Sequence, residues 1–164
     1  MQFIFLTIFG FVAVEIFSYA AHRFLFHGVL WKIHQTHHTA RKGAFELNDI
    51  FSLIFALFSI FLMIFAEKPF AYSIAFPIGL GISIYGFIYF IIHDFFTHRR
   101  FLPFKSNSKL LLIIRAAHQR HHQTTEKIGI APYGLFIFDY AQFSEKISAA
   151  KTKKAEAKTI QLPL

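Results

Sequence analysis

Three long apolar stretches dominate the sequence and leave it few possible folds. They run from Phe3 to Tyr19, from Ile50 to Ala66 and from Phe70 to Ile92. A helix of about 20 residues crosses the roughly 30 Å hydrocarbon core of a bilayer, so the first and third stretches predict membrane-spanning helices. The second is shorter, and it spans only with Phe45 and Leu47 at its start or in a locally thinned bilayer. The pattern predicts an all-α integral membrane protein with about three transmembrane helices.

The composition agrees with a membrane setting. Apolar residues fill 55% of the 164 positions, and 24 of them are phenylalanine, which is more than a soluble domain of this size can bury. A net charge of +8 would point to nucleic acid in a soluble protein. Here the Lys and Arg residues lie outside the apolar stretches, as expected for loops at anionic headgroups, so we expect the bilayer and no nucleic acid as a partner. The chain has no cysteine, which excludes thiolate metal centres and disulfides.

Shorter segments complete the predicted fold. Leu110–His122 is amphipathic and predicts a helix at the membrane interface. Ile128–Phe143 is apolar but broken by Gly and Pro, which indicates an interfacial or re-entrant cover. No basic residue precedes Phe3, so we expect a retained first helix and not a cleaved signal. We expect residues 1–143 to form a single membrane-embedded domain and residues 144–164 to form a tail rich in Lys and Ala.

The distribution of Lys and Arg predicts the orientation. Two predicted spans separate the polar stretches His22–Asp49 and His93–Lys127, which contain every histidine. Because two crossings return the chain to its original side, both stretches emerge on one face. Of the 17 Lys and Arg residues only Lys68 falls on the other face. The positive-inside rule therefore places the histidines on the cytoplasmic face, in a bacterial inner membrane.

The ten histidines form four motifs whose number and spacing indicate metal binding. HxxxxH begins at His22 and at His93, and HxxHH begins at His34 and at His118. Residues three and four apart share a helix face, so each HxxHH motif can direct its imidazoles at one point. Five residues turn an ideal helix by about 140°, so HxxxxH requires either a local π-bulge or two different metals. Ten imidazoles exceed the ligands of one ion and predict a two-metal site. The predicted ligands are His22, His27, His34, His37, His38, His93, His98, His118, His121 and His122.

Polar residues beside the motifs are candidates for contacts to the ring nitrogens that bind no metal. Carboxylate and amide oxygens accept hydrogen bonds from such nitrogens, whereas helix capping and headgroup contact are the alternatives. Four candidates lie beside the motifs: Glu46, Asn48, Asp49 and Asp94.

Two features inside the apolar stretches are unusual. Glu15 is ionisable, which is costly in a membrane and favours a position facing the bundle. It shares a helical stripe with Tyr19 and His22, so we expect it to hydrogen-bond near the site or to line a substrate cavity. Small residues in the third stretch permit close helix packing, the favoured reading, or leave room for a lipid chain. They are Gly79, Gly81, Ser83 and Gly86.

Ligand type alone does not select the metal, because iron, copper and zinc all bind imidazole. A site at the bilayer surface reaches lipid-soluble molecules, which offer mainly C–H and C=C bonds. Hydrolysis by zinc needs a polar bond and usually a carboxylate base, and the chain contains no HExxH motif. A redox pair that activates O2 fits better. A structural zinc scaffold and a membrane metal transporter are the alternatives, and zinc can replace iron during expression.

The motifs and their flanks resemble the membrane fatty acid hydroxylase and sterol desaturase superfamily and, within it, the bacterial β-carotene hydroxylases. The most specific part is RKGAFELND at residues 41–49, supported by HDFFTHRR from His93 and AHQRHH ending at His122. The run APYGLF at residues 131–136 matches more loosely.

This resemblance implies a di-iron, O2-dependent monooxygenase with β-carotene 3-hydroxylase activity. Such an enzyme hydroxylates β-ionone rings at C3 and converts β-carotene through β-cryptoxanthin to zeaxanthin, with reduced ferredoxin as electron donor. Hydroxylation of a fatty acyl, sphingoid or sterol substrate is the alternative. A basic surface would dock the acidic ferredoxin; its predicted residues are Arg99, Arg100, Lys105, Arg115 and Arg120.

Overall fold

The structure is a computed structural model that describes residues 1–40 and 43–149. These residues form α-helices, two π-helices and irregular loops, so the predicted all-α class is confirmed. In chain order the elements are α1 (Gln2–Ala20), η1 (Ala21–Val29), α2 (Trp31–His38), α3 (Asp49–Ile64), α4 (Ala75–Tyr89), η2 (Phe90–Thr97), α5 (Lys109–His121) and a helical stretch at residues 140–149.

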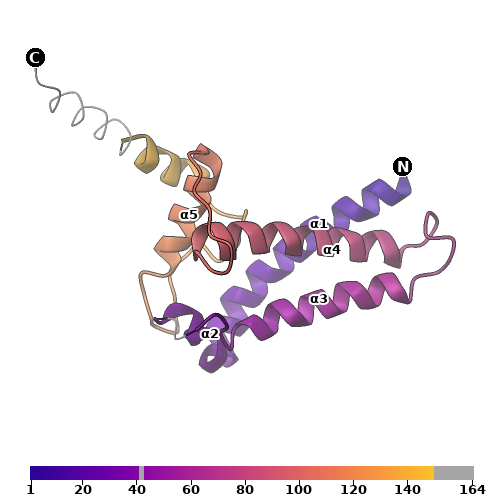
Figure 1. Cartoon of the computed structure of the whole chain (residues 1–164), viewed down its shortest axis with the longest axis horizontal. Helices are drawn as coiled ribbons and strands as arrows, with labels where there is room; N and C mark the ends of the chain where they lie inside the picture. Colours follow the sequence, from indigo (N-terminus) through magenta and orange to yellow (C-terminus); the bar gives the residue numbers. More distant parts are fainter. Residues whose placement is uncertain (41–42, 150–164) are drawn as a thin grey trace, which may run out of the picture.

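Three long helices form the body of the molecule, with α1 and α3 both packed against α4 (Figure 1). Two glycines of α4 allow this contact. A Cβ atom at Gly81 would lie 2.1 Å from the carbonyl oxygen of Thr7 in α1, and one at Gly79 would lie 2.9 Å from the carbonyl oxygen of Ser59 in α3. The helices therefore meet backbone to backbone, as small residues permit in membranes. The predicted packing role is confirmed for Gly79 and Gly81.

Two helices are long and apolar enough to cross a bilayer. Together α1 and η1 span Gln2–Val29, which is 28 residues, and α4 with η2 spans Ala75–Thr97, which is 23 residues. Helix α3 has 16 residues and a length of about 24 Å, less than the roughly 30 Å of the hydrocarbon core. The third span therefore stays a prediction. Outward side chains of α1 such as Ile8 and Ile16 are more than half exposed and provide a surface suited to lipid.

The predicted start of the third stretch was wrong. The chain still forms a turn at Pro69 and Phe70, and α4 begins only at Ala75. The Ser73 Oγ accepts a hydrogen bond from the Phe76 N–H at 3.2 Å, which satisfies a free donor in the first helical turn. Pro77, and not Pro69, occupies that first turn, where a missing N–H costs nothing.

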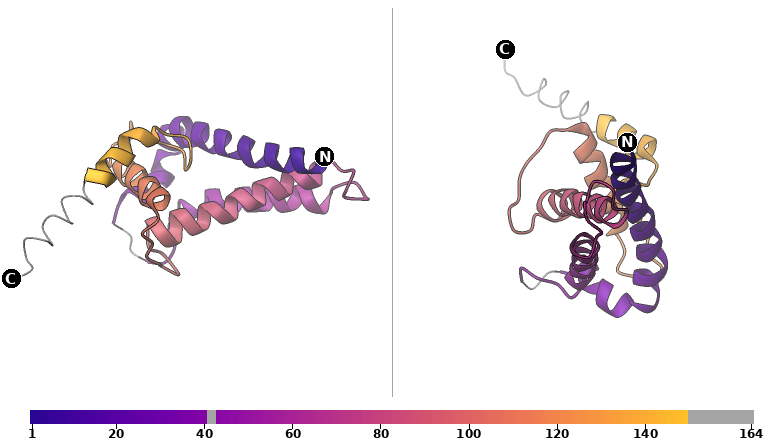
Figure 2. Two further views of the ribbon diagram at one scale, coloured as in Figure 1. Left: turned by 90° about the horizontal axis from the view of Figure 1, so that it is seen from above. Right: turned by 90° about the vertical axis from the view of Figure 1, so that its right-hand side faces the viewer.

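The elements that carry histidine gather at one end of the bundle. In Figures 1 and 2 the α2 and α5 helices lie opposite the chain's N-terminus and the turn between α3 and α4, which contains Lys68. Both histidine stretches are therefore on the same side, as two crossings predict. Their assignment to the cytoplasmic face stays a prediction.

The last described part of the chain packs on α5. Residues 128–139 are irregular, and the helical stretch that follows places Phe143 and Ile147 against Ile113 and Ala117. This helix passes the predicted domain boundary at residue 143. Most of the predicted tail, residues 150–164, lies outside the described residues, as do Arg41 and Lys42 of the RKGAFELND run.

Candidate metal centre

The two π-helices determine how the HxxxxH motifs are presented. In η2 the His98 N–H donates to the His93 carbonyl at 2.9 Å, the five-residue step of a π-helix. This wider turn brings the residue five positions later back to the face of the first. The rings of His22 and His27 are consequently 5.1 Å apart, and those of His93 and His98 are 4.5 Å apart. The predicted π distortion is confirmed. The alternative, in which the two histidines of one motif bind different metals, is wrong, because each pair has ring nitrogens within 4.8 Å of each other in a single cluster of ligands.

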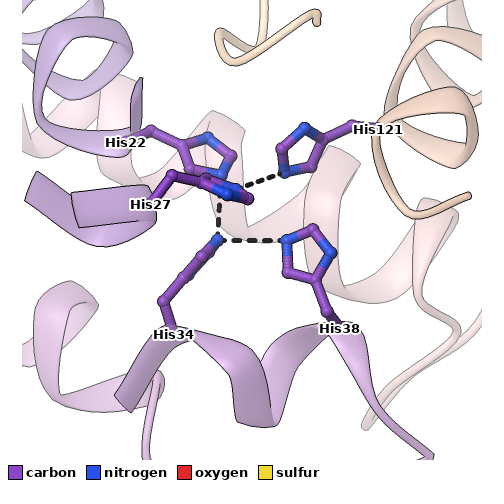
Figure 3. Close-up of side chains that lie close together, drawn as sticks. All are labelled: His22, His27, His34, His38 and His121. Atoms are coloured by element: carbon purple, nitrogen blue, oxygen red, sulfur yellow. Dashed lines mark hydrogen bonds between the residues drawn. The ribbon is translucent and has the colours of Figure 1, made fainter. Parts of the chain in front are cut away.

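Nine of the histidines fall into two adjacent groups. Within each group one ring nitrogen per residue lies within 4.8 Å of all the others, close enough to hold one metal ion. Figure 3 shows the imidazoles of the first group converging from η1, α2 and α5. The first group is His22, His27, His34, His38 and His121, and the second is His37, His93, His98 and His118.

Each HxxHH motif is divided between the groups, so the prediction that its imidazoles share one point was wrong. His34 and His38 are one turn apart on α2 and belong to the first group. His37 is rotated by about 100° from its neighbour His38 and joins the second group. On α5 the same division separates His121 from His118. Both helices therefore contribute to both groups and fix their separation.

His122 lies between the two groups. Its ring centroid is 4.4 Å from that of His38 in the first group and 4.5 Å from that of His118 in the second. Its Nε2 atom is buried and has no hydrogen-bond partner among the described residues. The nitrogen is therefore free for a ligand in either group.

Oxygen acceptors orient six of the imidazoles through Nδ1. The His34 Nδ1–H donates to Asn48 Oδ1 at 2.7 Å, and the His37 Nδ1–H donates to Glu46 Oε2 at 2.9 Å, as the sequence predicted for these two acceptors. Backbone carbonyls hold the Nδ1 atoms of the remaining four: Tyr133 for His22, Lys127 for His27, Thr124 for His38 and Ile130 for His121. These contacts place the proton on Nδ1 and leave the Nε2 lone pair directed into the groups.

The Nε2 atoms then face one another without a proton between them. The Nε2 atoms of His22 and His34 are 3.0 Å apart, and those of His27 and His121 are 3.1 Å apart. Two lone pairs at this distance repel each other unless a cation lies between them. Ligands at right angles around an ion, each about 2.1 Å from it, are about 3.0 Å apart. The donor set and its spacing therefore fit a metal ion.

Burial keeps the imidazoles in their neutral, metal-binding form. It lowers the pKa of His34 and of His121 to about 3 and the pKa of His38 to about 4. These side chains carry no proton on Nε2 at neutral pH.

Asp49 and Asp94 both bind Arg100. The guanidinium donates to Asp94 Oδ1 at 2.8 Å and to Asp49 Oδ2 at 2.5 Å, and the latter oxygen also accepts the Glu46 N–H. Asp94 Oδ2 is 3.5 Å from the Nδ1 of His93. Arg100 thereby ties the loop that contains Glu46 to the end of η2.

The predicted basic docking surface is smaller than expected. Arg100 is only 3% exposed, so its inclusion was wrong. The Arg115 guanidinium stacks on the Phe96 ring and donates to the Phe96 carbonyl, and it is half-buried. Arg99 and Lys105 are exposed and Arg120 is half-buried; these remain accessible.

Glu15 holds the segment that covers the site. It is 5% exposed, and its Oε2 accepts the Tyr85 hydroxyl at 2.5 Å. Its Oε1 accepts the N–H groups of Phe136 and Ile137 at 2.8 and 2.9 Å. A buried carboxylate thus joins α1, α4 and the irregular segment. The predicted hydrogen bonding near the site is found, with the Tyr85 hydroxyl and two backbone N–H groups as the partners.

Sequence reasoning missed Gly129. Its φ is +68°, and a Cβ atom there would lie 2.7 Å from the His27 Nδ1, so only glycine lets the backbone pass this close. Its neighbours Lys127 and Ile130 supply two of the carbonyl acceptors. The glycine was visible in the sequence as a break, but a backbone carbonyl has no sequence signature.

An apolar cavity of about 380 Å³ lies beneath the two groups, enclosed by α1, α3, α4 and residues 133–135. Aromatic and aliphatic side chains form most of its wall, as in sites for small apolar molecules. A molecule within it can reach both groups. The histidines that line its head are His22, His34, His37, His93 and His118.

Fold and site together suggest a membrane protein with two histidine groups, each able to hold a metal ion, at the head of an apolar cavity. The fatty acid hydroxylase family model matches residues 7–142, and the chain belongs to this family.

Curated relatives agree with this assignment. The chain is 34% identical to the β-carotene hydroxylase of Pantoea ananas over 159 residues, 94% of this chain and 85% of that one. It is 34% identical to the β-carotene hydroxylase of Pseudescherichia vulneris over 140 residues, 81% and 74% of the two chains. It is 41% identical to the chloroplastic β-carotene 3-hydroxylase 2 of Arabidopsis thaliana over 129 residues, 77% of this chain but 42% of the length of that relative. No solved structure matches the chain.

Proposed function

We propose that this chain is a di-iron, O2-dependent monooxygenase that hydroxylates C3 of the β-ionone rings of carotenoids. β-Carotene would be converted through β-cryptoxanthin to zeaxanthin. The observation that carries the proposal is the position of the two histidine groups at the head of an apolar cavity. Relatives that cover most of the chain are named β-carotene hydroxylases, and the proposal extends their activity to this chain.

The proposed ligands of the two irons are the ten histidines. The first group would hold one iron and the second group would hold the other, with His122 between the two. Iron bound there supplies O2 activation: one oxygen atom enters a C–H bond and the other leaves as water, with two electrons and two protons. Zinc would fit the same nitrogens, so the protein must be loaded with iron before an assay.

The chain's own residues orient the ligands and keep water out. Asn48 and Glu46 fix the rings of His34 and His37 through Nδ1, which limits the ways in which Nε2 can point. The apolar cavity wall excludes water and holds the substrate ring against the two histidine groups. The same C–H bond therefore lies next to the metal site in every turnover. No side-chain nucleophile is required.

Electrons would come from reduced ferredoxin at the cytoplasmic face of a bacterial inner membrane. Arg99, Lys105 and Arg120 lie near the site and offer positive charge to an acidic donor. Turnover with purified ferredoxin should therefore weaken as salt rises, and Arg99→Glu should weaken it at low salt.

The family description favours one alternative, hydroxylation of a fatty acyl chain. It uses the same groups and cavity, and only the product separates it from carotenoid hydroxylation. A metal transporter is less supported, because both groups lie at one end of the helices and not along a path between the two faces.

The deciding experiment is chromatography of pigments from cells that make β-carotene and express the chain. Intact protein should produce zeaxanthin, His121→Ala should not, and Gln119→Ala, an exposed change on the same helix, should match the intact protein. Unchanged β-carotene in cells with iron-loaded protein and a competent reductant would contradict the carotenoid assignment. Analysis of the membrane lipids from the same cells would then reveal a hydroxylated acyl chain.

A further inference from the structure

Helices α3 and α4 are in contact at the end of the cavity far from the histidines. There the Ser83 hydroxyl donates to Ser59 Oγ at 3.1 Å across α3 and α4, and Gly79 packs on the backbone of α3. At the other end Asn48 lines the cavity beside the histidine groups. From Asn48 to Ser59 the helix rises about 16 Å, which sets the length of the enclosed space.

Gly86 forms part of the α4 wall and has no structural reason to be glycine. A Cβ atom at Gly86 would meet nothing within 4 Å, whereas one at Gly79 or Gly81 would collide with a neighbouring helix. Among the described glycines the positive φ is at Gly129. The backbone at Gly86 is therefore one that any residue can adopt. Glycine inside a helix is less favourable than alanine, so its presence here leaves space at some cost in stability.

The space beside Gly86 opens to the outside of the bundle. Gly86 lines the cavity and is also exposed, and the same holds for Ser52 and Ala56 on the facing side of α3. All three residues are small, so little side-chain volume separates the cavity from the outside of the bundle at this level. The opening faces the apolar surface of the helices, where lipid lies.

The head of the cavity is prepared for a bound group. His37 lines it, is 5% exposed, and has an Nε2 atom without a hydrogen-bond partner in the described part of the chain. His93 lines it beside His37, with the two ring centroids 4.9 Å apart. The reacting end of a substrate therefore lies at this head, and its remainder must follow the cavity.

We infer that Gly86, facing Ser52 and Ala56, forms a lateral portal for a rod-shaped ringed terpenoid, with one ring at the histidines and the polyene passing out into the bilayer. This rests on the proposed function. An extended carotenoid is about as long as the roughly 30 Å hydrocarbon core is thick, so a rigid rod cannot fit in an enclosed space of half that length. The two rings are consequently hydroxylated one at a time. The missing side chain at Gly86 lets the rest of a long substrate leave the cavity.

The test compares substrates of two lengths in iron-loaded full-length protein reconstituted in nanodiscs. The variants are Gly86→Ala, Gly86→Val and Gly86→Leu, with Ile84→Phe as the matched control, because Ile84 is exposed on α4 and does not line the cavity. The substrates are β-carotene and retinol, which has the same ring and a short chain. Binding is read without turnover, under argon, from the visible circular dichroism that the protein induces in bound β-carotene.

The portal predicts a graded loss with side-chain size. Gly86→Leu should lower kcat/KM for β-carotene by roughly tenfold or more, the scale of a few misplaced methylenes in an apolar site, and should weaken the induced dichroism. Retinol turnover by Gly86→Leu, and both substrates with Ile84→Phe, should stay within about twofold of the intact protein. Equal losses for both substrates, or no loss with Gly86→Leu, would overturn the portal. If the intact protein hydroxylates neither substrate, the proposed function fails, and the induced dichroism still decides the portal.

Discussion

Single hydrogen bonds decide how firmly each imidazole is aimed. Asn48 and Glu46 could be proposed from the sequence because polar side chains stood beside the HxxHH motif at His34. Asp49 and Asp94 were proposed for the same reason, but Arg100 binds both. A buried arginine between two carboxylates gives no signal in the sequence, because an Arg beside a histidine motif looks the same whether it points into the protein or into solvent.

Replacing Asn48 should weaken metal binding more than folding. Asn48→Ala leaves the His34 Nδ1–H without its acceptor, and loss of such a partner typically lowers metal affinity about 10- to 100-fold. Iron retention during titration with a chelator measures this loss. Gln35→Ala, an exposed change on the same helix, is the control, and equal retention in the two variants would show that Asn48 does not orient a ligand.

The metal-free protein should lose stability in acid. An unfolded histidine has a pKa near 6.5, whereas burial lowers the pKa of His34 and His121 to about 3 and that of His38 to about 4. Below pH 6.5 the unfolded chain binds protons that the folded chain cannot bind, so stability falls as the pH drops from about 6.5 toward 4 and is constant with respect to these groups above 7. Thermal unfolding of chelator-treated protein across this range tests the sign; a flat or rising midpoint temperature in acid would be the opposite result.

Helix type, more than residue spacing, controls which histidines meet. Regular α-helical geometry predicted that the imidazoles of one HxxHH motif meet at one metal and that the two of an HxxxxH motif do not. In the structure each HxxxxH pair lies in one group and each HxxHH motif is divided between two. The π-turns of η1 and η2 unite the HxxxxH pairs, and adjacent histidines such as His37 and His38 diverge because one residue turns an α-helix by about 100°. A π-turn is stabilised by its surroundings and has no distinct residue preference, so the sequence allowed it without selecting it. The amphipathic helix follows from periodicity, and the long apolar helices follow from the length of the apolar stretches, so these were predictable.

The cover over the site should depend on Glu15. Glu15→Ala would leave the N–H groups of Phe136 and Ile137 without their acceptor, at about 1–3 kcal/mol for each buried unsatisfied group. The Tyr85 hydroxyl would lose Glu15 but keep Ser18 Oγ, 3.2 Å away, as a partner. Faster hydrogen exchange at residues 133–137 and a lower midpoint of thermal unfolding are expected. Tyr85→Phe removes only one of the three donors, so it should leave exchange in this segment close to that of the intact protein. Equal exchange in Glu15→Ala and the intact protein would mean that other contacts hold the cover.

For the whole molecule, the even number of crossings and the positive-inside rule together predict the topology, and the structure places both histidine stretches at one end. The predicted topology requires α3 to cross the bilayer although it has only 16 residues. A short helix crosses when its flanking residues reach the interface or the bilayer thins around it, at a modest cost for each ångström of mismatch. The exposed apolar side chains along α3, Leu53, Leu57 and Phe61 among them, would otherwise face water, which favours crossing.

Labelling in intact cells can test this topology, because the chain has no cysteine and single-cysteine variants give one signal each. Lys68→Cys and Lys105→Cys both replace exposed residues, one in the turn between α3 and α4 and one in the loop between η2 and α5. A membrane-impermeant maleimide should label Lys68→Cys in intact spheroplasts and should label Lys105→Cys only after the membrane is opened. If both react before opening or both only after, α3 and α4 do not form a crossing pair, and α3 lies along the interface with its apolar face in the lipid. If Lys105→Cys alone reacts before opening, the crossing pair stands and the histidine groups face outward, where a cytoplasmic ferredoxin could not reach them.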